Sequence, residues 1–266
     1  MSIMNIKTSN SLFFLTYYKC YARIRSTKRG DIMKLNAFQK IKYVNMFRKY
    51  LNEYGSAYSD SSRKFVEENF LKLTEPGETP DILVQLYAKF GMLSDSENIY
   101  LGFSKMIGEQ YGWNTKILEV GGGYYPIFSK YIDDAQKKNG KGTITVMDPV
   151  LVTNKLGRVK LQKEEFSHDM NVSQFDLLVG ICPCEATTEI IKSAVMNQKE
   201  FFIAMCGCTH FPMTDMPWFY GHSYIYRMWV EEILYLAREQ EKDGFIIHQE
   251  MVDNFPYPII YSKTKK

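Results

Sequence analysis

The sequence predicts an α/β protein: a doubly wound, mostly parallel sheet with an antiparallel final strand, preceded by an N-terminal helical region. Three observations predict this fold. Apolar residues recur every three or four positions as far as residue 112, short apolar runs alternate with helical patterns beyond it, and no helix separates the last two runs. Strands joined by crossover helices pair in parallel, whereas two strands joined by a short turn are antiparallel.

The helical region covers residues 33–112. Within residues 35–51 the apolar side chains return every three or four positions, as on one face of an amphipathic helix. Similar patterns predict helices over residues 61–73, 80–92 and 97–111. We expect these helices to form a cap over the ligand site of the sheet that follows.

The domain predicted at residues 113–266 alternates strands with helices. Its parallel strands are expected at residues 116–120, 143–147, 159–162, 175–179 and 201–205. Helical patterns follow the first, fourth and fifth of these strands, the last from about Ser223 to Lys242. Residues 245–249 and 258–262 are the two closing strands.

Composition and charge exclude several classes of protein. With 45% hydrophobic and 24% charged residues, the chain is neither disordered throughout nor collagen-like. Residues 1–32 contain six Lys or Arg and one Asp, and we interpret them as a basic N-terminal arm. The remainder has 27 basic and 29 acidic residues, which argues against a large nucleic-acid-binding surface.

The sequence also indicates a cytoplasmic protein. No apolar run approaches the roughly 18–20 residues that cross a bilayer, so we expect neither a transmembrane helix nor a membrane partner. Five cysteines are too few for a disulfide scaffold in a chain of 266 residues.

The segment after the first strand has the composition of a ligand-binding turn. An α/β sheet binds its ligand beyond the carboxyl ends of its strands, so the residues that follow each strand are candidates for the site. Here Glu119 is followed by Gly121, Gly122 and Gly123. Glycines permit positive φ angles and let a ligand lie against bare backbone.

Two further strands end in residues suited to a nucleoside. Asp148 follows the second strand, 25 residues beyond Gly123, where a carboxylate can accept hydrogen bonds from both hydroxyls of a ribose. Glu165 and Phe166 follow the third strand and offer a polar group and an aromatic ring to an adenine.

These features together resemble the class I S-adenosylmethionine-dependent methyltransferases. The likeness rests on Glu-x-Gly-x-Gly after the first strand, Asp148 after the second, Phe175-Asp-Leu-Leu opening the fourth, and the antiparallel closing strands characteristic of that family. It covers roughly residues 113–266. The resemblance implies S-adenosylmethionine as the cofactor and methyl transfer as the reaction.

The resemblance also implies roles for individual residues. The turn, with Glu119, Gly121, Gly122 and Gly123, would line the methionine part of the cofactor. Asp148 would bind its ribose. The pair that follows the third strand, Glu165 and Phe166, would bind its adenine.

The sequence departs from the family at two positions, and both changes can reshape or partly fill the pocket. Tyr125 stands where many members have another small residue, and Pro149 follows Asp148. A dinucleotide-binding turn would need a third glycine at position 126, which is Pro, and a phosphate-binding loop would need Gly-Lys-Ser/Thr after the turn. Both alternatives are therefore disfavoured.

Four cysteines are expected near the reaction centre. Cys182 and Cys184 follow the fourth strand, and Cys206 and Cys208 follow the fifth, whose end should lie alongside it. Three interpretations remain open. Cys184 or Cys208 can act as a nucleophile, the four thiols with the nearby His210 can bind zinc, or the cysteines can simply pack as small apolar residues.

The nucleophilic interpretation has its own resemblance. The strand residues before Pro183-Cys184 are similar to the corresponding motif of cytosine-C5 methyltransferases, in which a thiolate adds to C6 of the base. The residues after Cys184 do not continue that motif well. His210 is a further candidate, as a general base for a hydroxyl or amine acceptor.

The sequence thus predicts methyl transfer from S-adenosylmethionine to an unidentified acceptor, with a small molecule favoured over nucleic acid. The alternatives are a protein of this fold that holds the cofactor or a metal without turnover, and a cytosine-C5-type enzyme that uses Cys184.

Overall fold

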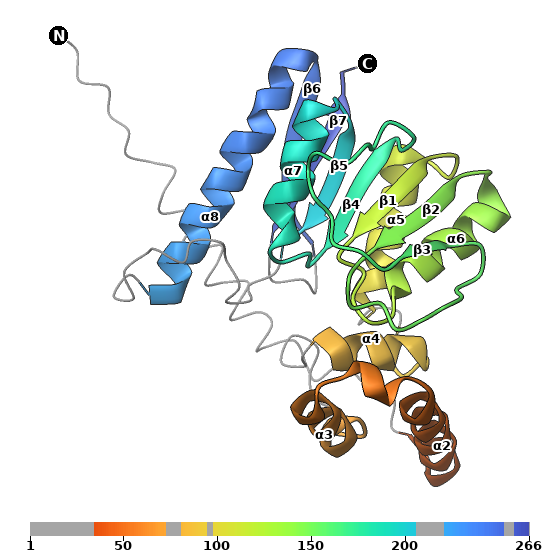
Figure 1. Ribbon diagram of the computed structural model, residues 1–266. Coiled ribbons are helices and arrows are strands. Elements are labelled where there is room, and N and C mark those ends of the chain that lie inside the picture. Colours follow the sequence, from red (N-terminus) through yellow and green to blue (C-terminus); the bar gives the residue numbers. More distant parts are fainter. Residues whose placement is uncertain (1–34, 73–80, 95–97, 206–220, 253–257, 266) are drawn as a thin grey trace.

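The computed structural model describes residues 35–72, 81–94, 98–205, 221–252 and 258–265. Its centre is a seven-stranded sheet in the order β3-β2-β1-β4-β5-β7-β6 (Figure 1). The strands are β1 (Lys116–Val120), β2 (Thr143–Met147), β3 (Lys160–Gln162), β4 (Leu177–Ile181), β5 (Glu200–Ala204), β6 (Phe245–Met251) and β7 (Pro258–Thr264). The predicted fold class is confirmed.

Strands β1 to β5 pair in parallel, and the direction reverses at β7, which is antiparallel to both β5 and β6. The predicted start of the fourth strand is wrong, because β4 begins at Leu177 and not at Phe175. Phe175 N–H instead closes a turn onto Val172 O, and the Asp176 carboxylate accepts a hydrogen bond from Lys116 N–H at the start of β1. The hydrogen bonds of Phe175 and Asp176 thus lie outside β4, which begins at the next residue.

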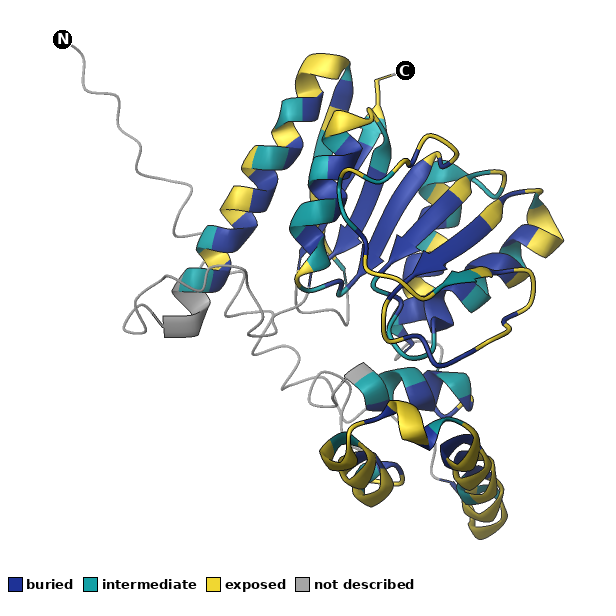
Figure 2. Ribbon diagram, in the orientation of Figure 1, coloured by how far each residue is buried: buried dark blue, intermediate teal, exposed yellow. Residues whose placement is uncertain are grey.

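Helices cover both faces of the sheet, as Figure 1 shows. Helices α5 (Ile99–Tyr111) and α6 (Ile127–Asn139) pack on one face, and α7 (Ala186–Met196) and α8 (Gly221–Arg238) pack on the other. Alternate residues of a strand point to opposite faces, so Ile117 joins the first core cluster and its neighbour Leu118 joins the second. The central strands are consequently buried along most of their length (Figure 2).

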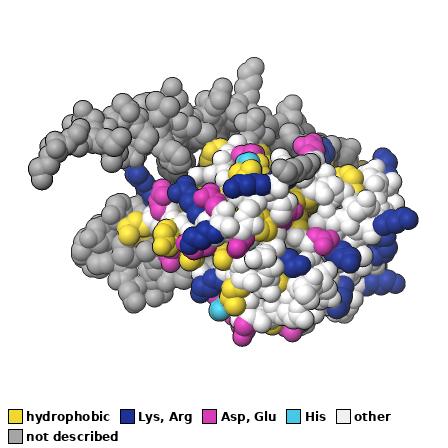
Figure 3. Space-filling model, turned by 90° about the horizontal axis from the view of Figure 1, so that it is seen from above, with side chains coloured by type: hydrophobic (Ala, Val, Ile, Leu, Met, Phe, Trp, Pro, Cys, Tyr) yellow, Lys and Arg dark blue, Asp and Glu magenta, His cyan; other side chains and the backbone are white. Residues whose placement is uncertain are grey.

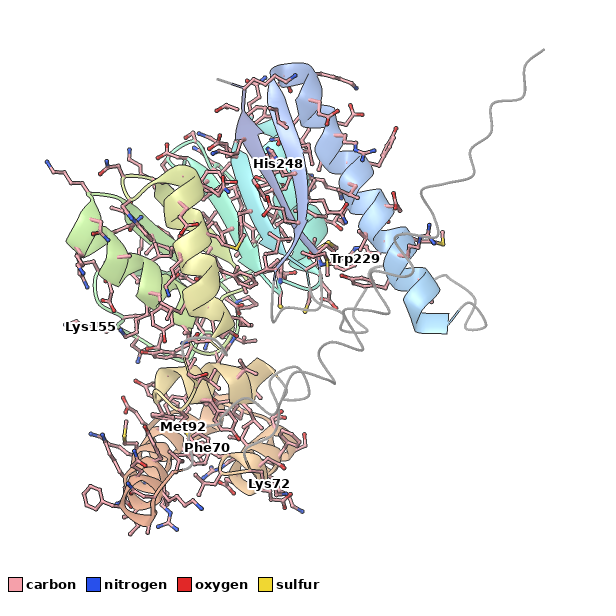
Figure 4. The ribbon with its side chains drawn as sticks, turned by 180° about the vertical axis from the view of Figure 1, so that it is seen from behind. Phe70, Lys72, Met92, Lys155, Trp229 and His248 are labelled. Atoms are coloured by element: carbon pink, nitrogen blue, oxygen red, sulfur yellow. The ribbon has the colours of Figure 1, made fainter. Side chains whose placement is uncertain are left out.

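The cap lies at the carboxyl edge of the sheet and contains α2 (Ala37–Tyr54), η1 (Gly55–Ala57), α3 (Asp60–Asn69) and α4 (Asp81–Lys89). Asn36 begins α2 with a capping box to Gln39, and Ser59 caps α3. Phe47 and Phe70 stack between these helices with ring centroids 3.9 Å apart. The buried apolar side chains of these helices form a small core that is separate from the two cores of the sheet. Figure 4 shows Phe70 in this small core, beside α4 and below the sheet.

The predicted helical region therefore divides into two structural parts. Its last helix, α5, belongs to the layer on the sheet, where Phe103 and Ile107 join the main core. At the end of α5 the Tyr111 hydroxyl reaches the carbonyl oxygens of Phe201 in β5 and Ser262 in β7, at 3.2 and 3.0 Å. This side chain ties α5 to the two strands between which the sheet reverses direction.

Replacing Tyr111 by Phe removes that hydroxyl and leaves the ring in place. We expect the free energy of unfolding to fall by about 0.5–1.5 kcal/mol, the usual net contribution of a hydrogen bond, measured by urea denaturation. Tyr235→Phe is the matched control, because Tyr235 is 69% exposed. Equal stabilities of the two variants would contradict the role assigned to Tyr111.

Candidate functional site

The turn after β1 has the glycine geometry that the sequence predicts. Gly121 and Gly123 have φ angles of 78° and 70°, in the region that disfavours other residues. Gly122 is needed for space, because a Cβ there would lie 2.7 Å from Cγ1 of Val146 in β2. All three glycines are therefore required by the structure, two for their conformation and one for close packing.

Asp148 holds this turn from the end of β2. Its Oδ2 accepts a hydrogen bond from Gly123 N–H at 2.9 Å, and its Oδ1 accepts one from Val150 N–H at 2.8 Å. The residue is 7% exposed. Asp148, the residue predicted to bind the ribose, is thus in direct contact with the predicted glycine turn, although 25 residues separate it from Gly123 in the chain.

Glu119 lies behind the turn, buried in the protein. It is 2% exposed and accepts a hydrogen bond from the Ser129 hydroxyl of α6. Burial raises the pKa of Glu119 from 4.5 to about 7, the Ser129 hydrogen bond opposes this rise, and the charge of Asp148 adds to it. In this structure Glu119 joins the turn to α6.

The loop after β4 packs directly against the turn. A Cβ on Gly121 would lie 3.1 Å from Cα of Pro183, so the two backbones approach closely. Cys182 and Cys184, on either side of Pro183, have φ angles of 53° and 50°, which is a strained conformation for residues other than glycine. Strain of this kind is common at functional sites.

The structure confirms that the ends of β4 and β5 are adjacent, since Cys182 N–H donates to Ala204 O at 2.8 Å. The Cys184 thiol donates to Cys182 O at 3.4 Å. Cys206, Cys208 and His210 lie outside the described residues. Within the described ranges, no group of three or more His, Cys, Asp or Glu side chains is arranged to hold a metal ion.

Two side chains of α4, which no sequence motif indicates, contact the glycine turn and the segment that follows it. Gln85 Oε1 accepts a hydrogen bond from Tyr125 N–H at 3.4 Å, and a Cβ on Gly123 would overlap the Gln85 amide. Lys89, one helical turn later, places its Nζ 4.0 Å from the ring centroid of Tyr125 and 3.9 Å from that of Tyr50. The side chain of Tyr125 therefore lies against the cap.

The two residues predicted to bind the adenine lie in different environments. Glu165 is exposed, whereas Phe166 is buried in the second core cluster, which also contains Val120 at the end of β1 and Met147 at the end of β2. The ring of Phe166 is thus part of the floor at the carboxyl ends of the first two strands.

A cavity of about 340 Å³ opens between the cap and the loops that follow β2 and β3. One of its lining residues, Leu151, is three residues beyond Asp148 in the chain. The lining combines polar and apolar side chains from Glu53, Tyr54, Ser56, Ala57, Leu151, Val152, Thr153, Asn154, Leu161 and Lys163.

No helix among the described residues is long and apolar enough to span a bilayer. Over the middle of the face seen in Figure 3, Lys and Arg side chains are interspersed with Asp and Glu.

No protein-family model matches the sequence, and no curated protein matches it. Among solved structures the chain is similar to the SAH-bound methyltransferase PaMTH1 of Podospora anserina, with 14% identity over 79% of this chain and 97% of that one, at a TM-score of 0.42. It is also similar to a SAM-dependent O-methyltransferase from Thermotoga maritima, with 13% identity over 66% of this chain and 73% of that one, at a TM-score of 0.40. A SAM-dependent methyltransferase from Aquifex aeolicus matches with 15% identity over 61% of this chain and 88% of that one, at a TM-score of 0.38.

The class of the fold rests on the strand order and not on these values. A sheet ordered 3-2-1-4-5-7-6, with a reversed seventh strand, is the fold of class I S-adenosylmethionine-dependent methyltransferases. The first strand of this sheet ends in a glycine turn, and the second ends in an acid that binds the turn.

The residues at the turn are chemically suited to this cofactor. A carboxylate has about four lone-pair positions, and the described residues give Asp148 two donors, which leaves capacity for ribose hydroxyls. Gly121 and Gly123 are half-buried, with Pro183 close to the first and Gln85 close to the second.

The pKa of Glu119 predicts how stability depends on pH. Because its pKa is higher in the folded than in the unfolded chain, protonation favours folding, and this contribution is lost as the pH rises from about 4.5 to about 7. In Glu119→Gln the dependence should disappear. The difference in free energy of unfolding, variant minus unmodified protein, should therefore be larger at a pH of about 8 than at a pH of about 5, by up to about 3 kcal/mol.

Urea denaturation at the two pH values measures this change. Glu165→Gln, at an exposed carboxylate, is the control and should show no such trend. A parallel pH dependence in Glu119→Gln and the unmodified protein would show that Glu119 is not the group responsible.

Proposed function

We propose that this protein binds S-adenosylmethionine on the turn formed by Gly121, Gly122 and Gly123 and transfers its methyl group to a small-molecule acceptor. One observation carries the proposal: the Asp148 carboxylate at the end of β2 is bonded to Gly123 N–H of the turn. The carboxylate proposed to bind the ribose and the glycine turn proposed to hold the amino-acid tail are thereby next to each other, in a sheet with the strand order β3-β2-β1-β4-β5-β7-β6.

The sulfonium of S-adenosylmethionine supplies an activated methyl group. In-line displacement of this kind depends mainly on positioning and on exclusion of water, and it requires no covalent intermediate with the protein. On this proposal Asp148 orients the ribose, and the glycine turn orients the methionine part. The cap, through Gln85 and Lys89, covers the turn on the side away from the sheet.

Two observations support a small acceptor. The cavity beside the cap, at about 340 Å³, has the size of small-ligand sites. The sequence outside residues 1–32 has slightly more acidic than basic residues. A surface that tracks a nucleic-acid backbone would be mainly basic.

A second candidate function follows from the strained loop after β4. The left-handed conformations of Cys182 and Cys184 flank Pro183, which touches Gly121. This places a thiol-bearing loop beside the turn on which the cofactor is proposed to lie. Such an arrangement favours Cys184 as the nucleophile of a cytosine-C5-type reaction.

Asp148→Asn tests the proposed cofactor site. Replacing one carboxylate oxygen by an amide removes a charged acceptor for the ribose hydroxyls, so the dissociation constant for S-adenosylhomocysteine should rise about ten- to a hundredfold. Isothermal titration measures the affinity, and thermal melting verifies that the variant is folded. The matched control is Asp134→Asn, at an exposed carboxylate of α6.

Binding of neither S-adenosylmethionine nor S-adenosylhomocysteine by the unmodified protein, at concentrations that detect micromolar affinity, would contradict the proposed function. Binding of both without methyl transfer to any acceptor tested would favour the non-catalytic alternative.

Cys184→Ala tests the second candidate function. If Cys184 is the nucleophile, the unmodified protein should form a covalent adduct with nucleic acid that contains 5-fluorocytosine, and the variant should form none. Denaturing electrophoresis detects the adduct, and Cys182→Ala is the control. Absence of an adduct in the unmodified protein would eliminate this function and leave the small-molecule proposal in place.

A further inference from the structure

Lys89 is a half-buried cation in an aromatic setting. Its Nζ lies 3.9 Å from the ring centroid of Tyr50, 4.0 Å from that of Tyr125 and 5.6 Å from that of Tyr54. Two of these rings come from α2 of the cap, and the third comes from the segment that follows the glycine turn. Lys89 thus occupies the junction between the cap and the proposed cofactor site.

The positive charge of Lys89 has no ion-pair partner among the residues that the structure describes. Among the described residues no carboxylate lies within ion-pair distance of its Nζ, and Glu53 acts on it only through a longer-range electrostatic attraction. Burial lowers the pKa of Lys89 from 10.5 to about 8, so the ammonium is still largely protonated at pH 7. A half-buried cation of this kind is stabilised by any anion that binds beside it.

The position of Lys89 identifies where such an anion would lie. Gln85 and Lys89 are four residues apart on α4 and therefore share one face of the helix. Gln85 contacts Gly123 and accepts a hydrogen bond from Tyr125 N–H, so this face of α4 runs along the glycine turn. Asp148 contacts the same turn from the sheet.

A ligand on the turn consequently meets opposite charges from two sides. The Asp148 carboxylate suits hydroxyl donors, and the Lys89 ammonium suits an anion. S-adenosylmethionine carries both groups, because its ribose has two hydroxyls and its amino-acid tail ends in a carboxylate.

We propose that Lys89 is the counter-ion for the amino-acid carboxylate of the cofactor, so that the cap helix α4 supplies part of the cofactor site. This inference rests on the proposed function and assigns a binding role to a residue outside the Rossmann-like domain. Tyr50 and Tyr125 hold the Lys89 side chain in position, and Glu53 is the acidic group whose attraction the cofactor carboxylate supplements.

Two ligands separate this role from a general effect on the pocket. S-adenosylhomocysteine has the amino-acid tail, and 5′-methylthioadenosine has the same nucleoside without it. In Lys89→Met the dissociation constant for S-adenosylhomocysteine should rise about ten- to a hundredfold, whereas that for 5′-methylthioadenosine should change by less than about threefold. Lys89→Arg, which keeps the charge, should restore most of the loss.

Isothermal titration of the full chain measures these affinities, and Lys105→Met, at an exposed lysine of α5, is the matched control. Equal loss of affinity for both ligands in Lys89→Met, or no loss for either, would overturn the role of Lys89 and leave the proposed function intact. If the unmodified protein binds neither ligand, both proposals fail. Thermal melting of Lys89→Met and Lys89→Arg shows whether a loss comes from unfolding.

Discussion

The close packing around the glycine turn is the constraint on which the rest of the site depends. Pro183 from the loop after β4 meets Gly121, Val146 of β2 lies under Gly122, and Gln85 from the cap lies over Gly123. A side chain at any of the three positions would push away one of these neighbours. The turn is therefore where two strands and the cap converge, and its lack of side chains lets all three approach it.

The charges around this turn are arranged in layers. Burial raises the pKa of Glu119 to about 7, so this carboxyl behind the turn is partly protonated near neutral pH and carries less negative charge than an exposed carboxylate. Asp148 keeps its two backbone donors and provides the negative charge at the end of β2. Lys89 provides the positive charge on the cap side. Glu119 and Asp148 thus have different tasks, because Glu119 accepts a hydrogen bond from Ser129 of α6, whereas Asp148 accepts one from Gly123 N–H of the turn.

Local sequence patterns were sufficient to predict the strands, the glycine turn and the position of Asp148, because each depends on residues close together in the chain. The start of β4 was predicted two residues early, since Phe175 and Asp176 are apolar and polar in the order of a strand. In the structure Phe175 N–H closes a local turn onto Val172 O, and the Asp176 carboxylate accepts a hydrogen bond from Lys116 N–H. Gln85 and Lys89 were missed because α4 reaches the turn only after folding. Their one local signal is that polar residues recur every four positions, at Asp81, Gln85 and Lys89, in a helix of otherwise largely apolar sequence.

The position of Lys89 also links cofactor binding to docking of the cap. Desolvation of its ammonium opposes docking, and the rings of Tyr50 and Tyr125 offset only part of that cost. On the proposed assignment a bound carboxylate neutralises this charge, so the cofactor binds more tightly when α4 is docked than when it is not. By linkage, the cofactor then stabilises the docked cap by the same free energy. Since methyl transfer needs a site from which water is excluded, the ligand itself would strengthen the contact that closes the site before reaction.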